Sequence, residues 1–278
     1  TFKKIIDSIE LDFDLKSLMF EGDDATLAKT GYTQPCMSAF AAGVTEVLKE
    51  NGIKPAGALG LSLGEYEALY LSGALNERDA MATVNKRGQF MSEIKEGTMS
   101  AVLFPDTETI KKIVDEIDGV WVANYNCPGQ TVISGTKEAV ALAGEKLKEA
   151  GAKRVLPLKV SGAFHSGLMD EAGKKLAKVL SDVEIMDIKI PYVANVNAKI
   201  VTDKKDIKDN LIAQVSGSVH LEQSIRNMMD WGVDTFVEIG PGKTMSGFVK
   251  KIDPGARVFN IEEYDDVNKV CSQILEAK

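Results

Sequence analysis

A segment in the middle of the chain carries a pattern of apolar residues that few folds can accommodate. Four short apolar runs predict strands, and two segments with apolar residues at helical spacing predict helices, in the order 100–104, 107–117, 120–124, 130–134, 137–150 and 154–158. The order β-α-β-β-α-β is the ferredoxin-like signature. With Gly97 and residues 160–162 as expected hinges, the pattern predicts a ferredoxin-like small subdomain, residues 98–159, inserted into a larger domain of residues 1–97 and 160–278.

The remainder of the chain also alternates between strand-like and helix-like segments. Residues 58–61 form a short apolar run that is followed by a helical pattern at 65–75. Residues 235–239 predict a strand, which is followed after a glycine turn at 240–242 by a helix at 245–252. Such alternation is typical of α/β proteins. We therefore expect an α/β fold with an α/β-hydrolase-like large domain.

Composition and charge exclude several classes of protein. The 278 residues, 44% of them hydrophobic and 27% charged, are typical of an ordinary globular protein of enzyme size. There is no apolar run of about 18 residues and no signal pattern at the start, so we expect a cytoplasmic protein that neither spans a membrane nor is secreted. A net charge of -8 argues against nucleic acid as the main partner. The widely spaced Cys36, Cys127 and Cys271 predict reduced thiols and no metal site. We also expect the protein to be a monomer.

Ser62 lies at the centre of a G-x-S-x-G motif, residues 60–64, between a predicted strand and a predicted helix. The flanking glycines permit the sharp turn that lifts the hydroxyl out of the strand, and the helix that follows directs its positive N-terminal end at the same point. We interpret Ser62 as a nucleophile. The alternative is a surface serine in a glycine turn.

A serine nucleophile needs a base, and histidine is the usual base near neutral pH. The chain has only His165 and His220. His165 follows the predicted small subdomain in a loop of small residues, where it could project into a cleft, whereas His220 begins an amphipathic helix, where a capping or surface role is more natural. We therefore predict that His165 is the base. The residues alone leave open what orients its ring, because the chain offers many acids and a backbone carbonyl could also serve.

Motifs spread over nearly the whole chain are similar to those of one known family. They are Tyr32-Thr33-Gln34-Pro35, residues 60–66, Lys86-Arg87-Gly88, residues 124–130, residues 162–169 and residues 238–243. In their order and spacing they resemble the malonyl-coenzyme A:acyl carrier protein transacylases of fatty-acid synthesis. One departure is Leu61, where the family often has histidine, but that side chain is not the base.

The resemblance implies an acyl transfer in two steps. Ser62 would take a malonyl group from malonyl-coenzyme A as an ester and then yield it to the phosphopantetheine thiol of an acyl carrier protein, with His165 acting as base and acid in each step. Gln214 matches the residue whose backbone carbonyl orients the histidine. No cofactor or metal is implied, because the coenzyme A thioester is itself the substrate.

Three further residues receive substrate-binding roles from the resemblance. Arg87 matches the arginine that pairs with the free carboxylate of the malonyl group, a task that suits a planar guanidinium. Asn126 lies in one of the matching motifs and is expected to contact the substrate. Phe164 resembles the bulky residue that favours malonyl over methyl-branched groups; one methyl is typically worth only about 1–3 kcal/mol in a pocket, so this preference is expected to be graded.

The resemblance also implies where the oxyanion formed during the reaction would be stabilised. In the family one N–H donor comes from the residue after the serine, here Leu63. The other comes from a glutamine in a glycine-glutamine-rich turn that ends a first strand. The sequence begins at Thr1, past that turn, so we expect a preceding segment to carry the strand and the turn.

An acidic carrier protein would need a basic docking surface on this chain. Candidate residues lie in the predicted small subdomain and near the opposite rim: Lys146, Lys148, Lys153, Arg154, Lys243, Lys250 and Lys251. Glu145 and Glu149 dilute the charge of the first group, and ordinary solvated lysines are the alternative interpretation.

Three other functions share some of these features. A serine esterase or thioesterase would use Ser62 and His165 but would have no use for a buried Arg87. An acyltransferase of a polyketide or polyunsaturated pathway would use all three residues. A carrier-protein-binding module without catalysis would bind the carrier but would form no acyl-serine.

Overall fold

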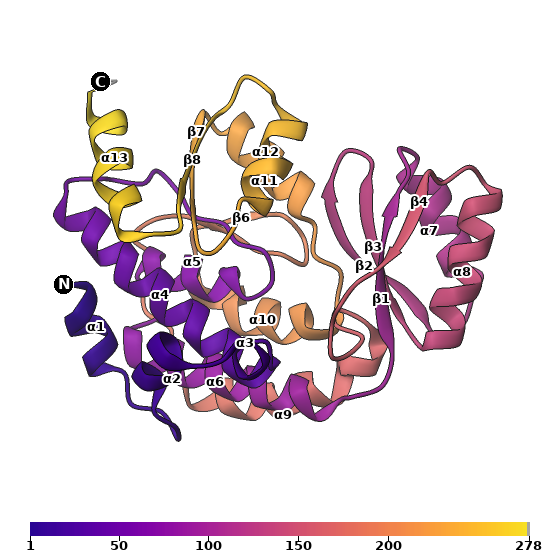
Figure 1. Ribbon diagram of the computed structural model, residues 1–278, viewed down its shortest axis with the longest axis horizontal. Helices are drawn as coiled ribbons and strands as arrows, with labels where there is room; N and C mark the ends of the chain where they lie inside the picture. Colours follow the sequence, from indigo (N-terminus) through magenta and orange to yellow (C-terminus); the bar gives the residue numbers. More distant parts are fainter. Residues whose placement is uncertain (277–278) are drawn as a thin grey trace.

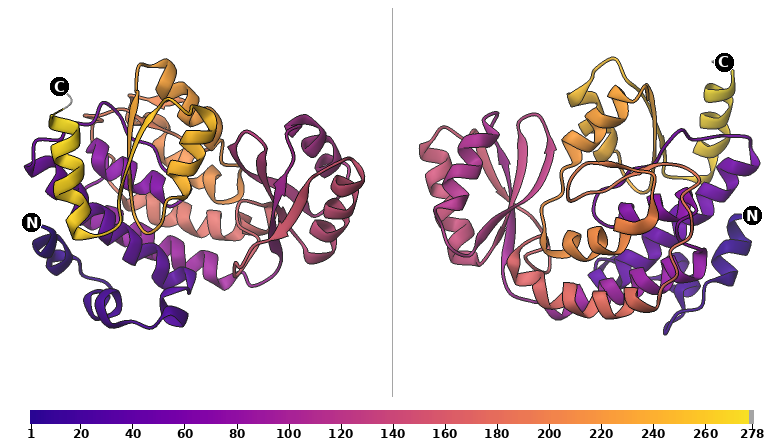
Figure 2. Two further views of the ribbon diagram at one scale, coloured as in Figure 1. Left: turned by 45° about the horizontal axis from the view of Figure 1, so that its top comes forward. Right: turned by 180° about the vertical axis from the view of Figure 1, so that it is seen from behind.

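The structure, a computed structural model, describes residues 1–276 as an α/β protein with a larger and a smaller part (Figure 1). The larger part opens with six helices: α1 (Phe2–Ser8), α2 (Leu15–Glu21), α3 (Asp24–Leu27), α4 (Thr30–Glu50), α5 (Gly64–Ser72) and α6 (Glu77–Glu93). The chain returns to it with two 3-10 helices, Gly167–Met169 and Lys204–Asp206, and with α9 (Asp170–Asp182), β5 (Tyr192–Val193), β6 (Ile200–Val201), α10 (Ile207–Ser216), α11 (Leu221–Asp230), β7 (Thr235–Ile239), α12 (Thr244–Ile252), β8 (Arg257–Ile261) and α13 (Tyr264–Leu275). Helices α1 and α13, the first and last helices of the described residues, lie on the side remote from the smaller part (Figures 1 and 2).

The smaller part has a strand or a helix at each of the six positions predicted for it. Its elements are β1 (Thr98–Leu103), α7 (Thr107–Asp115), β2 (Val120–Cys127), β3 (Gln130–Gly135), α8 (Lys137–Glu149) and β4 (Arg154–Pro157). The strands form one antiparallel sheet in the order β2-β3-β1-β4, in which Ser100 lies opposite both Ile133 and Pro157. Helices α7 and α8 cover one face of this sheet (Figure 1).

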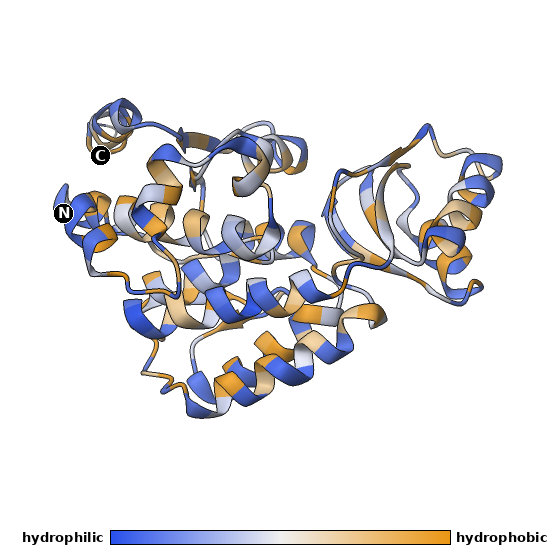
Figure 3. Cartoon of the chain, turned by 60° about the horizontal axis from the view of Figure 1, so that its bottom comes forward, coloured by the Kyte–Doolittle hydropathy of each residue, from blue (hydrophilic) through white to orange (hydrophobic). Residues whose placement is uncertain are grey.

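Helix caps and apolar spacing explain why these helices begin and pack where they do. Asp106 accepts a hydrogen bond from the backbone N–H of Thr109 at 3.0 Å, and Thr136 accepts one from Ala139 at 3.1 Å, which satisfies an orphan donor at the start of each helix. The apolar faces of both helices and of the sheet form a separate core that includes Val102, Ile110, Val114, Ile133 and Leu147. Figure 3 shows this pattern as a change of colour from one face of the helices to the other.

The core of the larger part lies among its long helices. Residues from α4, α5, α6, α9 and α10 are fully or almost fully buried there, among them Ala39, Leu69, Val84, Leu176 and Leu211. The predicted strand at 235–239 is β7, which pairs in parallel with β8, and the predicted helix after it is α12. These two strands and the pair β5–β6 complete the sheets of the described residues.

The strand predicted at 58–61 is reduced to a single parallel bridge between Ala58 and Tyr192. Ala58 donates to the carbonyl of Pro191 at 2.9 Å and accepts from Val193 at 3.0 Å. The ladder stops there because the chain turns sharply: a Cβ on Gly60 would lie 2.1 Å from the carbonyl carbon of Gly64. The helix predicted at 65–75 is α5, which ends at Ser72 because Gly73 adopts a left-handed conformation, with φ of 80°.

The two parts are joined by backbone hydrogen bonds as well as by the chain. Val219 lies beside the edge strand β2, donates to Ala123 at 2.8 Å and accepts from Tyr125 at 2.9 Å. The ring of His220 stacks on that of Tyr125, with the centroids 5.0 Å apart. Within the described residues the His220 side chain makes no capping hydrogen bond to α11, so the capping role considered for it is replaced by this stacking.

Candidate active site

Ser62 is held in a strained turn between the Ala58 bridge and α5. Its φ is 54°, a left-handed value that non-glycine residues rarely adopt and that requires support from the surrounding structure. Asn195 gives that support with both ends of its amide: its Oδ1 accepts from the Ser62 backbone N–H, and its Nδ2 donates to the Gly60 carbonyl, each at 2.7 Å. The hydroxyl is thereby presented at the start of the helix.

His165 reaches Ser62 across 103 positions of sequence. Its Nε2 lies 2.8 Å from Ser62 Oγ, and its Nδ1 lies 2.8 Å from the backbone carbonyl oxygen of Gln214. A carbonyl can only accept, so Nδ1 carries the proton and Nε2 of the neutral ring is free to accept the proton of Ser62. This geometry is that of a nucleophile and its base.

The imidazole of His165 is buried and neutral. Burial, together with the positive charge of Arg87, lowers the pKa of His165 to about 4. The ring therefore remains an unprotonated base throughout the neutral range.

Arg87 is a buried cation whose partners are all neutral. With 1% of its surface exposed, it donates from Nη1 to Gln34 Oε1 at 2.7 Å and from Nη2 to Ser62 Oγ at 2.8 Å and Gln214 Oε1 at 2.9 Å. Its guanidinium carbon lies 5.4 Å from the centroid of the Tyr66 ring. No ion pair within residues 1–276 involves Arg87. Burying a charge without an opposite charge in direct contact is costly, so this arrangement favours binding of an anion next to Ser62.

The backbone N–H of Leu63 is free to act on developing negative charge. The next three amides, those of Gly64, Glu65 and Tyr66, donate to carbonyls at 3.0–3.1 Å in the first turn of α5. The Leu63 amide has no acceptor among the described residues. A free amide beside the serine is the kind of donor that forms an oxyanion hole.

The other two predicted residues are less closely connected to Ser62. Phe164 adjoins His165 in sequence and is partly buried against the core of the larger part and against a second apolar cluster of the smaller sheet that includes Met99 and Ala123. Asn126 is buried on β2, and its Oδ1 receives no hydrogen bond from any described residue. Hydrogen bonds thus bring Ser62, His165, Arg87 and Gln214 together, but they do not include Asn126.

Three polar residues of the site carried no predicted role. Gln34 and Asn195 hold Arg87 and the Ser62 turn, as described above. Glu65 is buried, accepts from Gln214 Nε2 at 2.8 Å and from the Asn195 backbone at 3.2 Å, and has its pKa raised to about 7 by burial. In the sequence, the only indication of a role for Glu65 is its position directly after the G-x-S-x-G motif. The residues that it contacts, Asn195 and Gln214, lie 130 and 149 positions away.

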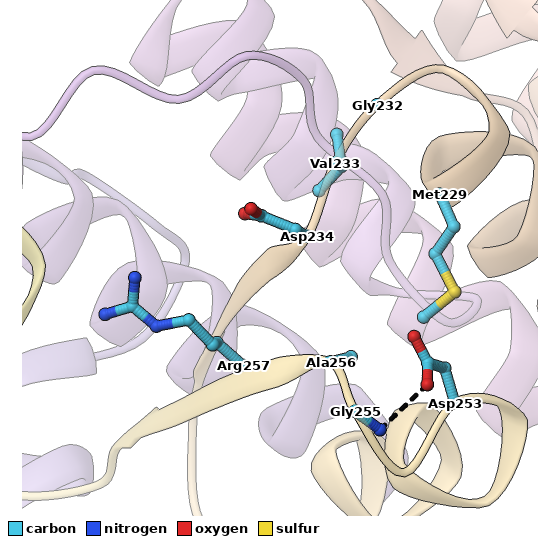
Figure 4. A pocket seen from close by; sticks show the side chains of 8 residues that line it. All are labelled: Met229, Gly232, Val233, Asp234, Asp253, Gly255, Ala256 and Arg257. Carbon is cyan, nitrogen blue, oxygen red and sulfur yellow. Dashed lines mark hydrogen bonds between the residues drawn. The ribbon is translucent and has the colours of Figure 1, made fainter. Parts of the chain in front are cut away.

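Other kinds of site were sought in the described part of the chain. No group of three or more His, Cys, Asp or Glu residues is arranged there to hold a metal ion, and no helix has both the length and the apolar character needed to cross a membrane. A surface hollow where β7 and β8 begin has as its lining Met229, Gly232, Val233, Asp234, Asp253, Gly255, Ala256 and Arg257 (Figure 4). This lining includes none of the predicted site residues.

Comparison with known proteins gives the class to which this fold and site belong. The model of the family described as "Acyl transferase domain" matches residues 7–259. The chain therefore belongs to the acyl transferase family.

The names of individual relatives are more specific than the description of the family. The chain is 44% identical to the malonyl CoA-acyl carrier protein transacylase of Bacillus subtilis, over 99% of this chain and 89% of that protein. It is similar to the structure of the malonyl CoA-acyl carrier protein transacylase from Clostridium perfringens, with a TM-score of 0.93, 38% identity and coverage of 99% of this chain and 88% of the other. A malonyl-transacylase in complex with a type II PKS acyl-carrier protein has a TM-score of 0.90 and 33% identity, and the match covers 98% of this chain and 89% of that one.

Proposed function

We propose that this protein transfers a malonyl group from malonyl-coenzyme A to the phosphopantetheine thiol of an acyl carrier protein, through an ester on Ser62, for fatty-acid synthesis. The observation that carries the proposal is the position of Ser62 Oγ, 2.8 Å from both a neutral histidine base and a buried arginine. The base suits acyl transfer, and the arginine suits an acyl group that ends in a carboxylate. The names of the relatives support the same donor and acceptor.

In the first half-reaction the Ser62 hydroxyl gives its proton to His165 Nε2 while Oγ attacks the thioester carbonyl. The Leu63 N–H donates to the oxygen that becomes negative. Collapse of the tetrahedral intermediate breaks the carbon–sulfur bond, and coenzyme A leaves as a thiol with the proton from His165. The Gln214 carbonyl holds the ring in one tautomer throughout by accepting from Nδ1.

The second half-reaction is the reverse with a different thiol. The phosphopantetheine thiol gives its proton to His165 and attacks the ester carbonyl, and Ser62 leaves with that proton restored. Arg87 binds the free carboxylate of the malonyl group with its planar fork during both steps. Phe164 narrows the space beside the base and disfavours an additional methyl, and Asn126 contacts the bound substrate.

The finer description of the fold belongs to this proposal. The order β2-β3-β1-β4, with two helices on one face, supports a ferredoxin-like small subdomain of residues 98–159. The larger part, residues 1–97 and 160–278, would be the α/β-hydrolase-like catalytic domain. Its serine turn followed by a helix supports that description.

The remaining expectations concern the setting of the enzyme. We infer a cytoplasmic monomer that acts without a cofactor or metal ion and binds neither nucleic acid nor membrane. Exposed Lys153 and Arg154 of the smaller part are candidates for contact with an acidic carrier. Lys250 is a weaker candidate, because its Nζ already donates to the carbonyl of Ala256 at 2.7 Å.

A carrier of a type II polyketide synthase is a second candidate acceptor, favoured by the carrier complex among the structural neighbours. A simple esterase or thioesterase is disfavoured, because hydrolysis of a neutral ester gives no role to a buried cation at the nucleophile.

The proposal is tested by acylation without a carrier. Purified protein is mixed with malonyl-coenzyme A and its intact mass is measured, with Ser62→Ala as the control. A malonyl adduct on the wild type and none on the variant is expected. Absence of an adduct on the wild type, or an equal adduct on the variant, would refute the proposed nucleophile.

A further inference from the structure

Glu65 is a buried carboxyl at the active site that takes no part in the steps above. It has 0% of its surface exposed. Its Oε2 accepts hydrogen bonds from Gln214 Nε2 and from the Asn195 backbone N–H, at 2.8 and 3.2 Å, while its Oε1 has no partner among residues 1–276. A buried carboxyl is costly to maintain, and its position one turn from the nucleophile calls for an explanation.

The side-chain amide of Gln214 contacts four groups of the site. Its Nε2 donates to Glu65 Oε2 and to the Ser62 carbonyl, each at 2.8 Å, and its Oε1 accepts from Arg87 Nη2 at 2.9 Å. An amide has two N–H donors on one atom and an acceptor on the other. Because Glu65 Oε2, the Ser62 carbonyl and, at the longer distance of 3.4 Å, Asn195 Oδ1 surround Nε2, the oxygen must point at Arg87. The flipped amide would place N–H groups against the guanidinium and leave the carboxyl of Glu65 facing an oxygen.

We propose that Glu65 is a positioning residue, which fixes the orientation of the Gln214 amide and thereby holds Arg87 where it can bind the carboxylate of the acyl group. This inference rests on the proposed function, since it explains how the same site recognises a carboxylated substrate. Glu65 itself touches neither Ser62 Oγ nor the reacting atoms.

The role of Glu65 requires its acceptor atom and does not depend on its charge. Burial raises the pKa of Glu65 to about 7, and Arg87, Tyr66 and Tyr192 are the ionisable groups that interact with it from α6, α5 and β5. The unpartnered Oε1 can carry a proton, so Oε2 accepts in both ionisation states. A glutamine can likewise place its oxygen at the Oε2 position and its NH₂ group at the Oε1 position.

The test compares initial rates of Ser62 acylation by malonyl-coenzyme A and by acetyl-coenzyme A, whose acyl group lacks the carboxylate. Glu65→Ala removes the acceptor, so the ratio of the malonyl to the acetyl rate is expected to fall about 10-fold or more, the effect of leaving one buried donor without a partner. Glu65→Gln is expected to keep the ratio within about 3-fold of the wild type. Glu67→Ala, which removes a neighbouring buried carboxyl of the same helix, should leave the ratio unchanged.

A merely structural role would lower both rates together, because it reduces the fraction of folded enzyme without changing its preference. Equal losses of both rates in Glu65→Ala, or a ratio in Glu65→Gln as low as in Glu65→Ala, would overturn the inference. If Glu65→Ala does not fold, Glu65→Asp gives the same test, because its shorter side chain withdraws the acceptor while keeping the charge. A wild type that malonyl-coenzyme A does not acylate would instead refute the proposed function itself.

Discussion

At the scale of single residues, the chemistry depends on the two groups that contact Ser62 Oγ. His165 Nε2 accepts from the hydroxyl and Arg87 Nη2 donates to it, so the oxygen is held in one direction before any substrate arrives. The base and the cation lie close enough for the charge of Arg87 to lower the pKa of His165. The proposed nucleophile, the proposed base and the proposed carboxylate-binding residue are therefore coupled electrostatically.

Replacement of Arg87 tests its role in recognition. Arg87→Ala is expected to slow acylation by malonyl-coenzyme A about 100-fold or more, because a buried carboxylate would lose its charged partner, while acylation by acetyl-coenzyme A is retained. The two rates are measured by quenching and intact mass. Arg87→Lys serves as the control, and it should restore only part of the malonyl rate because an ammonium lacks the planar fork. Equal losses with both donors would contradict this role.

The same replacement should change the titration of His165. Arg87 lowers the pKa of His165, so Arg87→Ala is expected to raise that pKa from about 4 toward its ordinary value. At a pH between the His165 pKa of the wild type and that of Arg87→Ala, the ring is neutral in the wild type and protonated in the variant. Acylation by acetyl-coenzyme A should therefore decline at a higher pH in the variant than in the wild type. NMR titration of the ring protons measures the pKa, and His220→Ala identifies the second of the two histidines. An unchanged or lower pKa in Arg87→Ala would contradict the prediction.

At the scale of the elements, α5 carries two buried carboxyls beside the nucleophile turn. Glu65 has two hydrogen-bond donors, whereas both carboxyl oxygens of Glu67 are removed from solvent and only the Ser38 side chain favours the charged form of that carboxyl. The start of helix α5 therefore presents the proposed nucleophile, while the buried carboxyl of Glu67 within the helix lowers the stability of the fold.

Glu67 predicts a specific dependence of stability on pH. Burial raises its pKa from 4.5 to about 8, so between these values the folded protein binds a proton that the unfolded chain has released. The free energy of unfolding must then fall as pH rises through this window, and the loss is complete above it. Glu67→Gln is expected to be more stable than the wild type by about 1–3 kcal/mol at high pH, and the difference should shrink toward pH 4.5. Urea unfolding at several pH values measures this, and a difference independent of pH would contradict it.

Elements with a strong local pattern could be predicted from the sequence. All six elements of the smaller part, and β7 with α12, lie at the predicted positions because their apolar spacing and capping residues act within a few positions. The prediction of a strand at 58–61 was wrong beyond the bridge at Ala58, because the apolar run did not reveal the sharp turn at Gly60. Ser62 could be predicted from its motif, whereas Asn195 could not, because its contact with Ser62 spans 133 positions.

At the scale of the whole molecule, the smaller part is fixed against the larger one close to the active site. Val219 extends the pairing of β2, and His220 donates from its backbone to Asn195, which supports the Ser62 turn. A continuous set of hydrogen bonds therefore runs from the edge of the smaller sheet to the nucleophile.

The stacked rings at this junction should contribute to stability without taking part in the chemistry. His220→Ala removes the stacking on Tyr125 and is expected to lower the free energy of unfolding by about 0.5–1.5 kcal/mol. Acylation of Ser62 should be nearly unchanged under conditions where the variant is folded. Urea unfolding and the intact-mass assay measure the two quantities. A free energy of unfolding equal to that of the wild type, or a large loss of acylation in the folded variant, would contradict this view of the junction.

The central claim is that the enzyme transfers the malonyl group to a thiol rather than to water. Protein acylated on Ser62 is mixed with an acyl carrier protein that bears the phosphopantetheine thiol, or with the same carrier without it, and the masses of both proteins are followed. The structure predicts that the malonyl group leaves Ser62 rapidly and appears on the carrier only when the thiol is present. Loss of the adduct at the same rate with both carriers, and no malonyl on either, would show a hydrolase and contradict the account.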